Sequence, residues 1–309
     1  GERILSSRHA LGLDSVPERM VVVGAGYIGM ELATVYRKLG CDVTILEQLA
    51  EPLPGYESDV TEVVRGRAED LGIDFQFGHA AKDWEETDEG LVVTAEDESG
   101  DIERFEAETC LVAVGRRPVT ETLNLEAVGV ETDDDGFIAT DDRARTSEDG
   151  VFAVGDVAGD PMLAHKAFRE GEVAAEVIAG EPAALDYQAI PAAVFTDPEI
   201  GTVGMTEREA EEAGFDPVVG EMPLRASGRA LTLGEREGFV RVVADSETEF
   251  VLGAQIVAPE ASELVAELAL AVELGATLED VAATIHIHPT LSEAVHEAVK
   301  GARGESIHY

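Results

Sequence analysis

A glycine-rich turn near the N-terminus constrains the fold of this 309-residue chain more than any other feature. The turn, Gly24-Ala25-Gly26-Tyr27-Ile28-Gly29, follows the apolar run 20–23 and precedes a helix expected from Ile28, Leu32, Val35 and Leu39, which Gly40 ends. In such a G-x-G-x-x-G turn the first glycine reverses the chain, the second lets backbone N–H groups approach a pyrophosphate, and the third brings strand and helix together. The pattern predicts a Rossmann-like dinucleotide-binding domain.

An acidic residue stands where such a domain would bind a ribose. The expected second strand, 43–46, ends at Glu47, 18 residues after Gly29, and a carboxylate there accepts hydrogen bonds from ribose hydroxyls. Glu47 would repel a 2′-phosphate, and residues 48–55 contain no Arg or Lys, so the sequence favours NAD over NADP. The alternative is an ordinary glycine-rich turn followed by a surface glutamate.

The remaining periodicity divides the chain into an α/β part and an α+β part. A helix over 60–71, a strand over 73–77, a hairpin of 91–94 with 102–105 and a strand over 109–114 would complete the first domain. A strand over 151–154 and a helix over 163–178 would form the next unit, followed by short strands (240–243, 250–256) and helices over 263–274 and 291–299. We expect a linker (1–15), a dinucleotide-binding domain (16–134), a middle segment (135–190) and an α+β domain (191–309).

Composition restricts the partners. Acidic residues outnumber basic ones by 64 to 22, giving a formal net charge of −42, and four of the basic residues are Lys. A uniformly acidic surface disfavours nucleic acid and anionic membranes, and suits a halophilic cytoplasm in which salt screens the repulsion. The two distant cysteines, Cys41 and Cys110, show no metal or redox spacing, and no signal peptide is recognisable, so we expect a cytoplasmic protein without a metal site.

Two further motifs could carry chemistry. Gly155-Asp156 follows an apolar run and precedes the helix start at 161–165, so Asp156 could bind a ligand hydroxyl or merely cap a turn. His288 and Glu293 could be a general base and the carboxylate that orients it. The alternative is that Glu293 forms a capping box with Thr290 at a strand-to-helix junction, with His286 and His288 alternating along the strand.

Taken in order, these motifs resemble the flavin-dependent pyridine nucleotide–disulphide oxidoreductases over essentially the whole chain. The segments that carry the resemblance are 22–32, Val114-Gly115-Arg116-Arg117-Pro118, 150–157 with 161–166, Phe195-Thr196-Asp197-Pro198-Glu199-Ile200, and 286–293. The resemblance implies a Rossmann-like NAD-binding domain, the second half of an FAD-binding domain and an α+β dimerisation domain. Within the family, the chain is most similar to the branch that oxidises the dithiol of dihydrolipoamide with NAD.

The resemblance also implies roles for individual residues. The residues that would bind a cofactor include Gly24, Gly26, Tyr27, Ile28, Gly29, Glu31, Glu47, Ala81 and Gly115. The glycine turn and Glu47 would form the NAD site, and Glu31 would lie close to the nicotinamide and the flavin. Asp156 would bind the FAD ribityl chain, and the backbone at Ala164 would meet the flavin ring. Met162, Leu163 and His165 would also bind a cofactor. His288, held by Glu293, would accept the dithiol proton in the partner subunit's site of a homodimer. The substrate would arrive on the lipoyl domain of an acyltransferase or of a glycine cleavage carrier protein.

The sequence also departs from the family. The family begins with an FAD-binding half that carries its own glycine fingerprint and a C-x4-C redox disulfide, and neither occurs in these 309 residues. We therefore expect the chain alone to be inactive, as the C-terminal two-thirds of such an enzyme. Alternatives are another flavin disulfide reductase of the glutathione or mercuric type, or a non-catalytic NAD-binding dimerisation module. The acidic Glu47 argues against the glutathione type, and the C-terminal residues 306–309, without vicinal cysteines, argue against the mercuric type.

Overall fold

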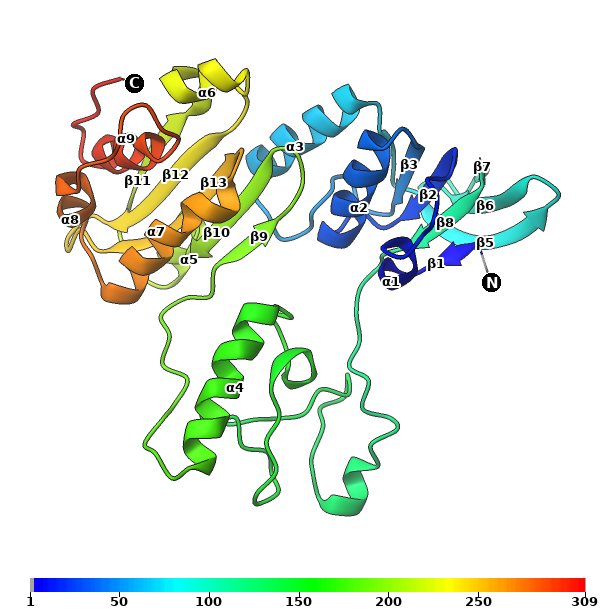
Figure 1. Cartoon of the computed structure of the whole chain (residues 1–309), viewed down its shortest axis with the longest axis horizontal. Coiled ribbons are helices and arrows are strands. Elements are labelled where there is room, and N and C mark those ends of the chain that lie inside the picture. Colours follow the sequence, from blue (N-terminus) through cyan, green and yellow to red (C-terminus); the bar gives the residue numbers. More distant parts are fainter. Residues whose placement is uncertain (1–2, 309) are drawn as a thin grey trace. The chain divides into compact units, whose positions relative to one another are not determined.

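The computed structural model describes residues 3–308 and divides the chain into two compact units. One unit comprises Gly1–Gly115 together with Pro191–Tyr309, and the other comprises Arg116–Ile190 (Figure 1). Residues 116–134 thus group with the middle segment, whereas the sequence placed them in the dinucleotide-binding domain. Residues 1, 2 and 309 of the expected linker and α+β domain lie outside the described part.

The first lobe of the larger unit is built on a parallel five-stranded sheet. Its strands, in spatial order, are β1 (Ile4–Leu5), β8 (Thr109–Val112), β2 (Arg19–Val23), β3 (Asp42–Glu47) and β4 (Asp74–Phe77). The helices of this lobe are α1 (Ser7–Ala10), α2 (Tyr27–Lys38) and α3 (Ser58–Leu71). Because β2 is followed by β3 on one side and flanked by β8 on the other, the strand order reverses beside β2, where open α/β sheets bind ligands.

The predicted linker contributes to this sheet. Ile4 and Leu5 pair in parallel with Cys110 and Leu111, and Ala10 is buried in the core next to α2. Linker composition did not reveal this contribution, because β1 is only two residues long and gains its hydrogen bonds from β8, about 105 positions later.

A separate antiparallel sheet replaces the expected hairpin. It consists of β5 (Ala80–Thr87), β6 (Gly90–Glu96) and β7 (Ile102–Ala107), in that order. The predicted strands correspond to β6 and β7. The first strand escaped prediction because seven of its eight residues are exposed and carry no apolar alternation, so pairing with β6 is what makes it a strand.

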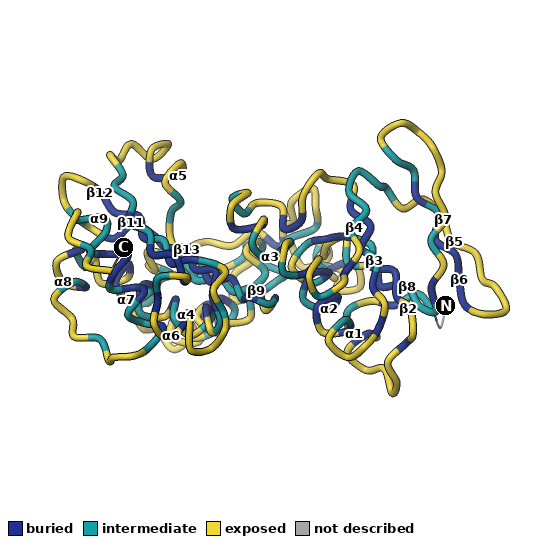
Figure 2. Tube along the Cα trace, turned by 90° about the horizontal axis from the view of Figure 1, so that it is seen from above, coloured by how far each residue is buried: buried dark blue, intermediate teal, exposed yellow. Residues whose placement is uncertain are grey.

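The second lobe of the larger unit is the α+β part. Its antiparallel sheet contains, in order, β11 (Pro217–Pro223), β12 (Phe239–Asp245), β13 (Val251–Ala258), β10 (Glu199–Gly204) and β9 (Ala192–Val194). Its helices are α5 (Glu207–Glu212), α6 (Gly228–Leu233), α7 (Ala261–Leu274), α8 (Leu278–Ala283) and α9 (Glu293–Ala302), with a 3-10 turn η3 (Leu224–Ala226). Helix α7 packs on β10 and β13, and α9 packs on β11 and β12, which buries the sheet (Figure 2).

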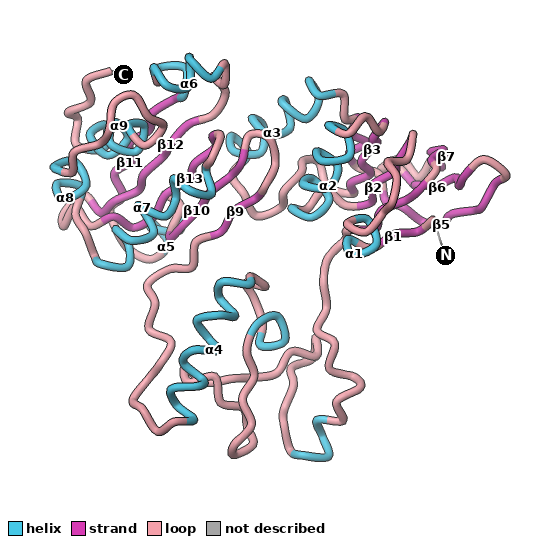
Figure 3. The backbone as a smooth tube through the Cα atoms, in the orientation of Figure 1, coloured by secondary structure: helices cyan, strands magenta, loops and turns pink. Residues whose placement is uncertain are grey.

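The smaller unit contains few regular elements. They are two 3-10 turns, η1 (Leu125–Val128) and η2 (Gly155–Ala158), and the helix α4 (Ala164–Ile178) (Figure 3). The strand predicted over 151–154 was wrong: Phe152 forms a single bridge with Arg145, and the described residues of this unit offer no sheet that could extend it. Val130, Ile138 and Ala153 form a small local core instead.

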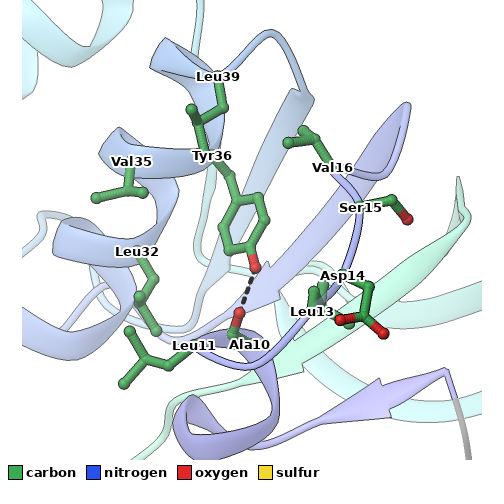
Figure 4. A pocket seen from close by; sticks show the side chains of 10 residues that line it. All are labelled: Ala10, Leu11, Leu13, Asp14, Ser15, Val16, Leu32, Val35, Tyr36 and Leu39. Atoms are coloured by element: carbon green, nitrogen blue, oxygen red, sulfur yellow. Dashed lines mark hydrogen bonds between the residues drawn. The ribbon is translucent and has the colours of Figure 1, made fainter.

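The apolar residues of α2 do not all lie in the core. Leu32 is buried, but Val35 and Leu39 are 46% and 60% exposed, while Met30 and Tyr36 are buried against the sheet. Val35 and Leu39 instead line an apolar pocket of about 250 Å³ between α1, residues 11–16 and α2, where the Tyr36 hydroxyl donates to the Ala10 carbonyl (Figure 4). None of the residues expected to bind a cofactor lines this pocket.

Within residues 3–308, no helix is both long and apolar enough to cross a lipid bilayer.

Candidate functional site

The three glycines of the turn between β2 and α2 have different structural reasons to be glycine. Gly24 has a φ of +99°, and a Cβ there would lie 2.7 Å from the Ala113 carbonyl oxygen after β8. A Cβ at Gly29 would lie 2.0 Å from the Gly24 carbonyl oxygen, so this residue lets the helix approach the turn. A Cβ at Gly26 would meet no atom within 4 Å, and the N-terminus of α2 has no side-chain cap. The first and third glycines serve the chain's own packing, whereas the second leaves open space beside the free N–H groups of a helix N-terminus, which suits a phosphate.

Glu47 lies at the carboxyl end of β3 and is tied to the same turn. Its Oε2 accepts a hydrogen bond from the Ala25 N–H at 2.7 Å, and its Oε1 accepts one from the Leu49 N–H at 2.9 Å. The residue is buried, with 7% of its surface exposed. A carboxylate offers about four lone-pair sites, so two remain for ribose hydroxyls.

Other residues expected to bind a cofactor lie around this edge of the sheet. The His79 N–H donates to the Glu47 carbonyl at 3.0 Å, which places the start of β5, with Ala81, beside β3. Gly115 follows β8 with a φ of +136°. Tyr27 is 39% exposed, whereas Ile28 packs against the lobe's core. The structure thus brings these residues to one edge, and their contacts with a cofactor stay a prediction.

Glu31, on α2, joins the two lobes of the larger unit. Its Oε1 accepts a hydrogen bond from the Phe195 N–H at 2.8 Å. Burial raises the pKa of Glu31 above its usual value, and the hydrogen bond from Phe195 opposes that shift in part. The carboxylate is therefore held at the junction of the dinucleotide-binding and α+β lobes.

In the smaller unit, Asp156 makes an ion pair and does not cap a turn. The turn η2 begins after Val154 without a side-chain cap, and Asp156 Oδ2 lies 2.9 Å from Arg116 Nη2, with 41% of its side chain exposed. The helix α4 begins at Ala164 after Leu163, also without a side-chain cap, and His165 lies in its first turn. Met162 directly precedes this helix start. An exposed carboxylate and an uncapped helix N-terminus in one unit can serve the hydroxyl and carbonyl groups of a ligand.

His288 and Glu293 form the expected pair. His288 Nδ1 lies 2.8 Å from Glu293 Oε1, and 80% of the His288 side chain is exposed, compared with 31% for Glu293. Burial raises the pKa of Glu293, but hydrogen bonds from the Thr290 N–H and from His288 outweigh it, so the net pKa is lowered and the carboxylate is ionised. An ionised partner at Nδ1 keeps that nitrogen protonated and leaves Nε2 as the accepting atom.

The capping alternative is half correct, because Glu293 serves both roles. Its Oε2 accepts the Thr290 N–H at 2.9 Å, but the residue preceding α9 is Ser292, and Thr290 Oγ1 donates to the Ile287 carbonyl instead of completing a box. The strand predicted through His286 and His288 was wrong: residues 284–292 form the connection between α8 and α9, with no strand edge beside it. His286 is structural, since its side chain is 6% exposed and its Nε2 lies 2.8 Å from Glu267 Oε1.

The two cysteines are unsuited to redox chemistry. Both are buried and unpaired, and burial raises the pKa of Cys41 to about 11 and that of Cys110 to about 12. Neither thiol therefore supplies a thiolate near neutral pH. Residues 3–308 also contain no cluster of three or more His, Cys, Asp or Glu side chains that could hold a metal ion.

Sequence reasoning missed the residues that join the lobes. Arg241 on β12 pairs with Glu57 at 3.2 Å, with Glu221 at 2.8 Å and also with Asp59, so it links β12 to the start of α3. Lys38 Nζ on α2 lies 2.7 Å from Asp197 Oδ2. No local pattern reveals the contacts between the lobes, because Arg241 lies more than 180 positions from Glu57 and Asp59, and Lys38 lies about 160 positions from Asp197.

Sequence reasoning also missed a contact between Glu297 of α9 and His308, which lies after the helix. Glu297, one turn after Glu293, accepts the N–H groups of Ile307 and His308 at 2.9 and 3.1 Å, and its Oε1 lies 3.1 Å from His308 Nδ1. Glu293 and Glu297 are four residues apart and so lie on the same face of α9, and this spacing was the feature of the sequence that could have pointed to Glu297.

Comparison with known families identifies both parts of the chain. Residues 1–171 match the family described as pyridine nucleotide-disulphide oxidoreductase, and residues 190–299 match its dimerisation domain. Among curated proteins, dihydrolipoyl dehydrogenase 2 of Haloarcula marismortui is 68% identical, covering 100% of this chain and 65% of its own length. The dihydrolipoyl dehydrogenase of Geobacillus stearothermophilus is 46% identical, covering 99% of this chain and 65% of its own length.

Solved structures show the same architecture. The crystal structure of LpdA from Mycobacterium tuberculosis superposes with a TM-score of 0.89 at 31% identity, covering 97% of this chain and 64% of that one. The HOCl-induced flavoprotein disulfide reductase RclA from Escherichia coli gives a TM-score of 0.88 at 26% identity, covering 96% of this chain and 68% of that one. The chain thus spans about 65% of the length of the curated relatives it matches. The haloarchaeal relatives support the halophilic interpretation of the acidic composition.

Proposed function

Because the chain belongs to the pyridine nucleotide-disulphide oxidoreductase family, we propose that it forms the NAD-binding, second FAD-binding and dimerisation parts of a dihydrolipoyl dehydrogenase. The substrate is the dithiol of dihydrolipoamide, which is oxidised to a disulfide while NAD is reduced. The observation that carries the proposal is the His288–Glu293 pair, since this exposed imidazole is aligned at Nδ1 by an ionised carboxylate.

The pair handles the proton of the substrate thiol. A thiol attacks a disulfide only as the thiolate, so one proton must leave the dithiol before sulfur–sulfur exchange. Nε2 of His288 accepts that proton, and Glu293 stabilises the resulting imidazolium through Nδ1. The 80% exposure of His288 suits a base that serves a substrate arriving from outside the subunit.

The chain's residues fit both cofactors of the family, FAD and NAD. Gly26 leaves the space in which the NAD pyrophosphate would meet the N-terminus of α2, and Glu47 would hold the adenosine ribose. Asp156 and the uncapped start of α4 would hold the ribityl chain and the ring of FAD. When bound, FAD supplies the two-electron carrier between the dithiol side and NAD.

The dimerisation domain supports a homodimer. We infer further that His288 acts in the partner subunit's site, and that a lipoyl domain of an acyltransferase or a glycine cleavage carrier delivers the substrate. The protein would then work in the cytoplasm, where the 2-oxoacid or glycine cleavage complexes supply the dithiol.

The test of the base compares His288→Gln with His9→Gln, a control imidazole on α1. The chain is supplemented with the portion of the Haloarcula marismortui relative that it does not span. His288→Gln should lower dihydrolipoamide-dependent NADH formation by about 10² to 10⁴, the usual contribution of a general base, while NADH oxidation by an artificial flavin oxidant stays near the parent rate. Equal loss of both half-reactions would show that His288 is structural.

The cofactor assignment is tested on the 309-residue chain itself. NADH should bind at least about tenfold more tightly than NADPH, or about 1.4 kcal/mol, because the Glu47 carboxylate repels a 2′-phosphate. Calorimetric dissociation constants within a factor of two of each other would contradict the assignment.

A further inference from the structure

A buried ion pair on α4 forms hydrogen bonds with both ends of the segment 155–159, which carries Asp156. Lys166 Nζ lies 2.8 Å from Glu170 Oε1, and the two side chains are only 5% and 7% exposed. Glu170 Oε2 also accepts the Gly155 N–H at 2.6 Å, and Lys166 Nζ donates to the Gly159 carbonyl at 3.0 Å. The pair therefore anchors the first residue of η2 and the residue that follows its last.

Helix stability alone does not explain this pair. Taking two charges out of water costs several kcal/mol per ion. The attraction between the charges offsets this cost only where their geometry is good and additional hydrogen bonds satisfy both groups. The same helix carries an ordinary exposed pair, Arg169 and Glu172, at 3.3 Å, with side chains 45% and 66% exposed. Besides being buried, each member of the Lys166–Glu170 pair forms a hydrogen bond with the 155–159 segment.

The segment needs such anchors. Gly155 has a φ of +78°, and a Cβ there would lie 3.1 Å from Ala167 Cβ, so the backbone runs close against α4 in a conformation that few residues adopt. Between the two anchors, the Asp156 carboxylate is exposed and paired with Arg116. The Asp156 side chain is thus accessible, while hydrogen bonds from α4 hold the backbone on either side of it.

We propose that Lys166 and Glu170 are positioning residues that hold residues 155–159, and with them Asp156, in the geometry that receives the ribityl chain of FAD. This rests on the proposed function, which makes Asp156 a flavin contact. In this role the ion pair acts through the backbone at Gly155 and Gly159.

The test uses two double variants that each remove both charges, so that no buried charge stays unpaired. Lys166→Met/Glu170→Gln keeps an oxygen for the Gly155 N–H, whereas Lys166→Met/Glu170→Leu does not. Arg169→Gln/Glu172→Gln, which removes the exposed pair on the same helix, is the matched control. Amide hydrogen exchange in the chain gives a readout that requires no flavin.

At Gly155, exchange should be about 10- to 100-fold faster in the Leu variant than in the Gln variant, as expected for losing a hydrogen bond to a polar side chain. Exchange over residues 171–178 of α4 should match the parent in both variants and in the control. Equal exchange at Gly155 in the two variants, or loss of protection along all of α4, would overturn the proposal.

A second experiment measures FAD affinity by flavin fluorescence. As in the test of His288, the chain is supplemented with the portion of the Haloarcula marismortui relative that it does not span. The Leu variant should bind FAD about tenfold more weakly than the Gln variant, and the control should bind as the parent does. If Asp156→Ala weakens binding but the Leu variant does not, the positioning role is refuted and the flavin contact stands. If Asp156→Ala has no effect, the proposed role of Asp156 fails, and the positioning proposal fails with it.

Discussion

The glycines of the β2–α2 turn allow cofactor binding to be separated from folding. Gly26 has φ −68° and ψ 176°, which alanine adopts without strain, and a Cβ there meets no protein atom within 4 Å. Gly26→Ala should therefore leave stability unchanged or raise it by about 0.4–1 kcal/mol through the unfolded state. The same Cβ occupies the space in which a pyrophosphate would approach the helix N-terminus, so NADH affinity should fall at least about tenfold.

Gly29→Ala should have the opposite profile. Its Cβ would stand 2.0 Å from the Gly24 carbonyl oxygen, a backbone atom, so the helix must move away from the turn. Such overpacking costs about 1–3 kcal/mol, which exceeds the roughly 1 kcal/mol gained by replacing a helical glycine. The melting temperature of the Gly29→Ala variant should therefore fall by several degrees.

Gly66→Ala, in the exposed part of α3 with nothing within 4 Å of its Cβ, is the control and should stabilise the chain without changing NADH binding. The measurements are thermal unfolding in high salt and calorimetric titration with NADH. Unchanged NADH affinity in Gly26→Ala would refute the placement of the pyrophosphate. A neutral Gly29→Ala would refute the close helix–turn contact.

Three further predictions concern stability. With a net charge of −42, the melting temperature should rise between 0.1 and 2 M KCl as repulsion is screened, and a flat or falling curve would contradict the halophilic interpretation. The pKa values of Glu293 and Glu297 are lowered in the folded chain because hydrogen bonds outweigh the effect of burial, so their stabilisation is present above the ordinary value near 4.5 and is lost as pH falls below it. Glu297→Gln should therefore flatten the acid limb of the unfolding curve, and an unchanged limb would count against this reasoning. Arg241→Gln should cost about 1–2 kcal/mol, less than a fully buried ion pair, since its partners are 37–49% exposed, and chemical denaturation should detect it.

Local sequence determined the turns that carry the candidate binding residues, because the conformation of each turn depends on only a few neighbouring residues. The G-x-G-x-x-G turn, the position of Glu47 at the end of its strand and the helix end at Gly40, with a φ of +101°, all depend on neighbours in the chain. Glycine spacing and strand ends are therefore readable without a structure.

Tertiary structure decided what depends on distant atoms. Val35 and Leu39 belong to the apolar repeat that predicted α2, yet they are 46% and 60% exposed and line a pocket, because the strands and the helix α1 against which α2 packs come from other segments of the chain. The strand predicted over 151–154 did not form because apolar residues make a strand only where a neighbouring edge accepts their hydrogen bonds. Residues 4 and 5 became a strand for the converse reason, since β8 offered such an edge.

The same division holds at His288 and Glu293. Sequence spacing allowed either a helix cap or an oriented base, because both use the same glutamate. Only the folded connection between α8 and α9 shows that one carboxylate oxygen takes the Thr290 N–H and the other takes His288 Nδ1. A carboxylate has two oxygens with separate directions, and only three-dimensional placement determines which groups they reach.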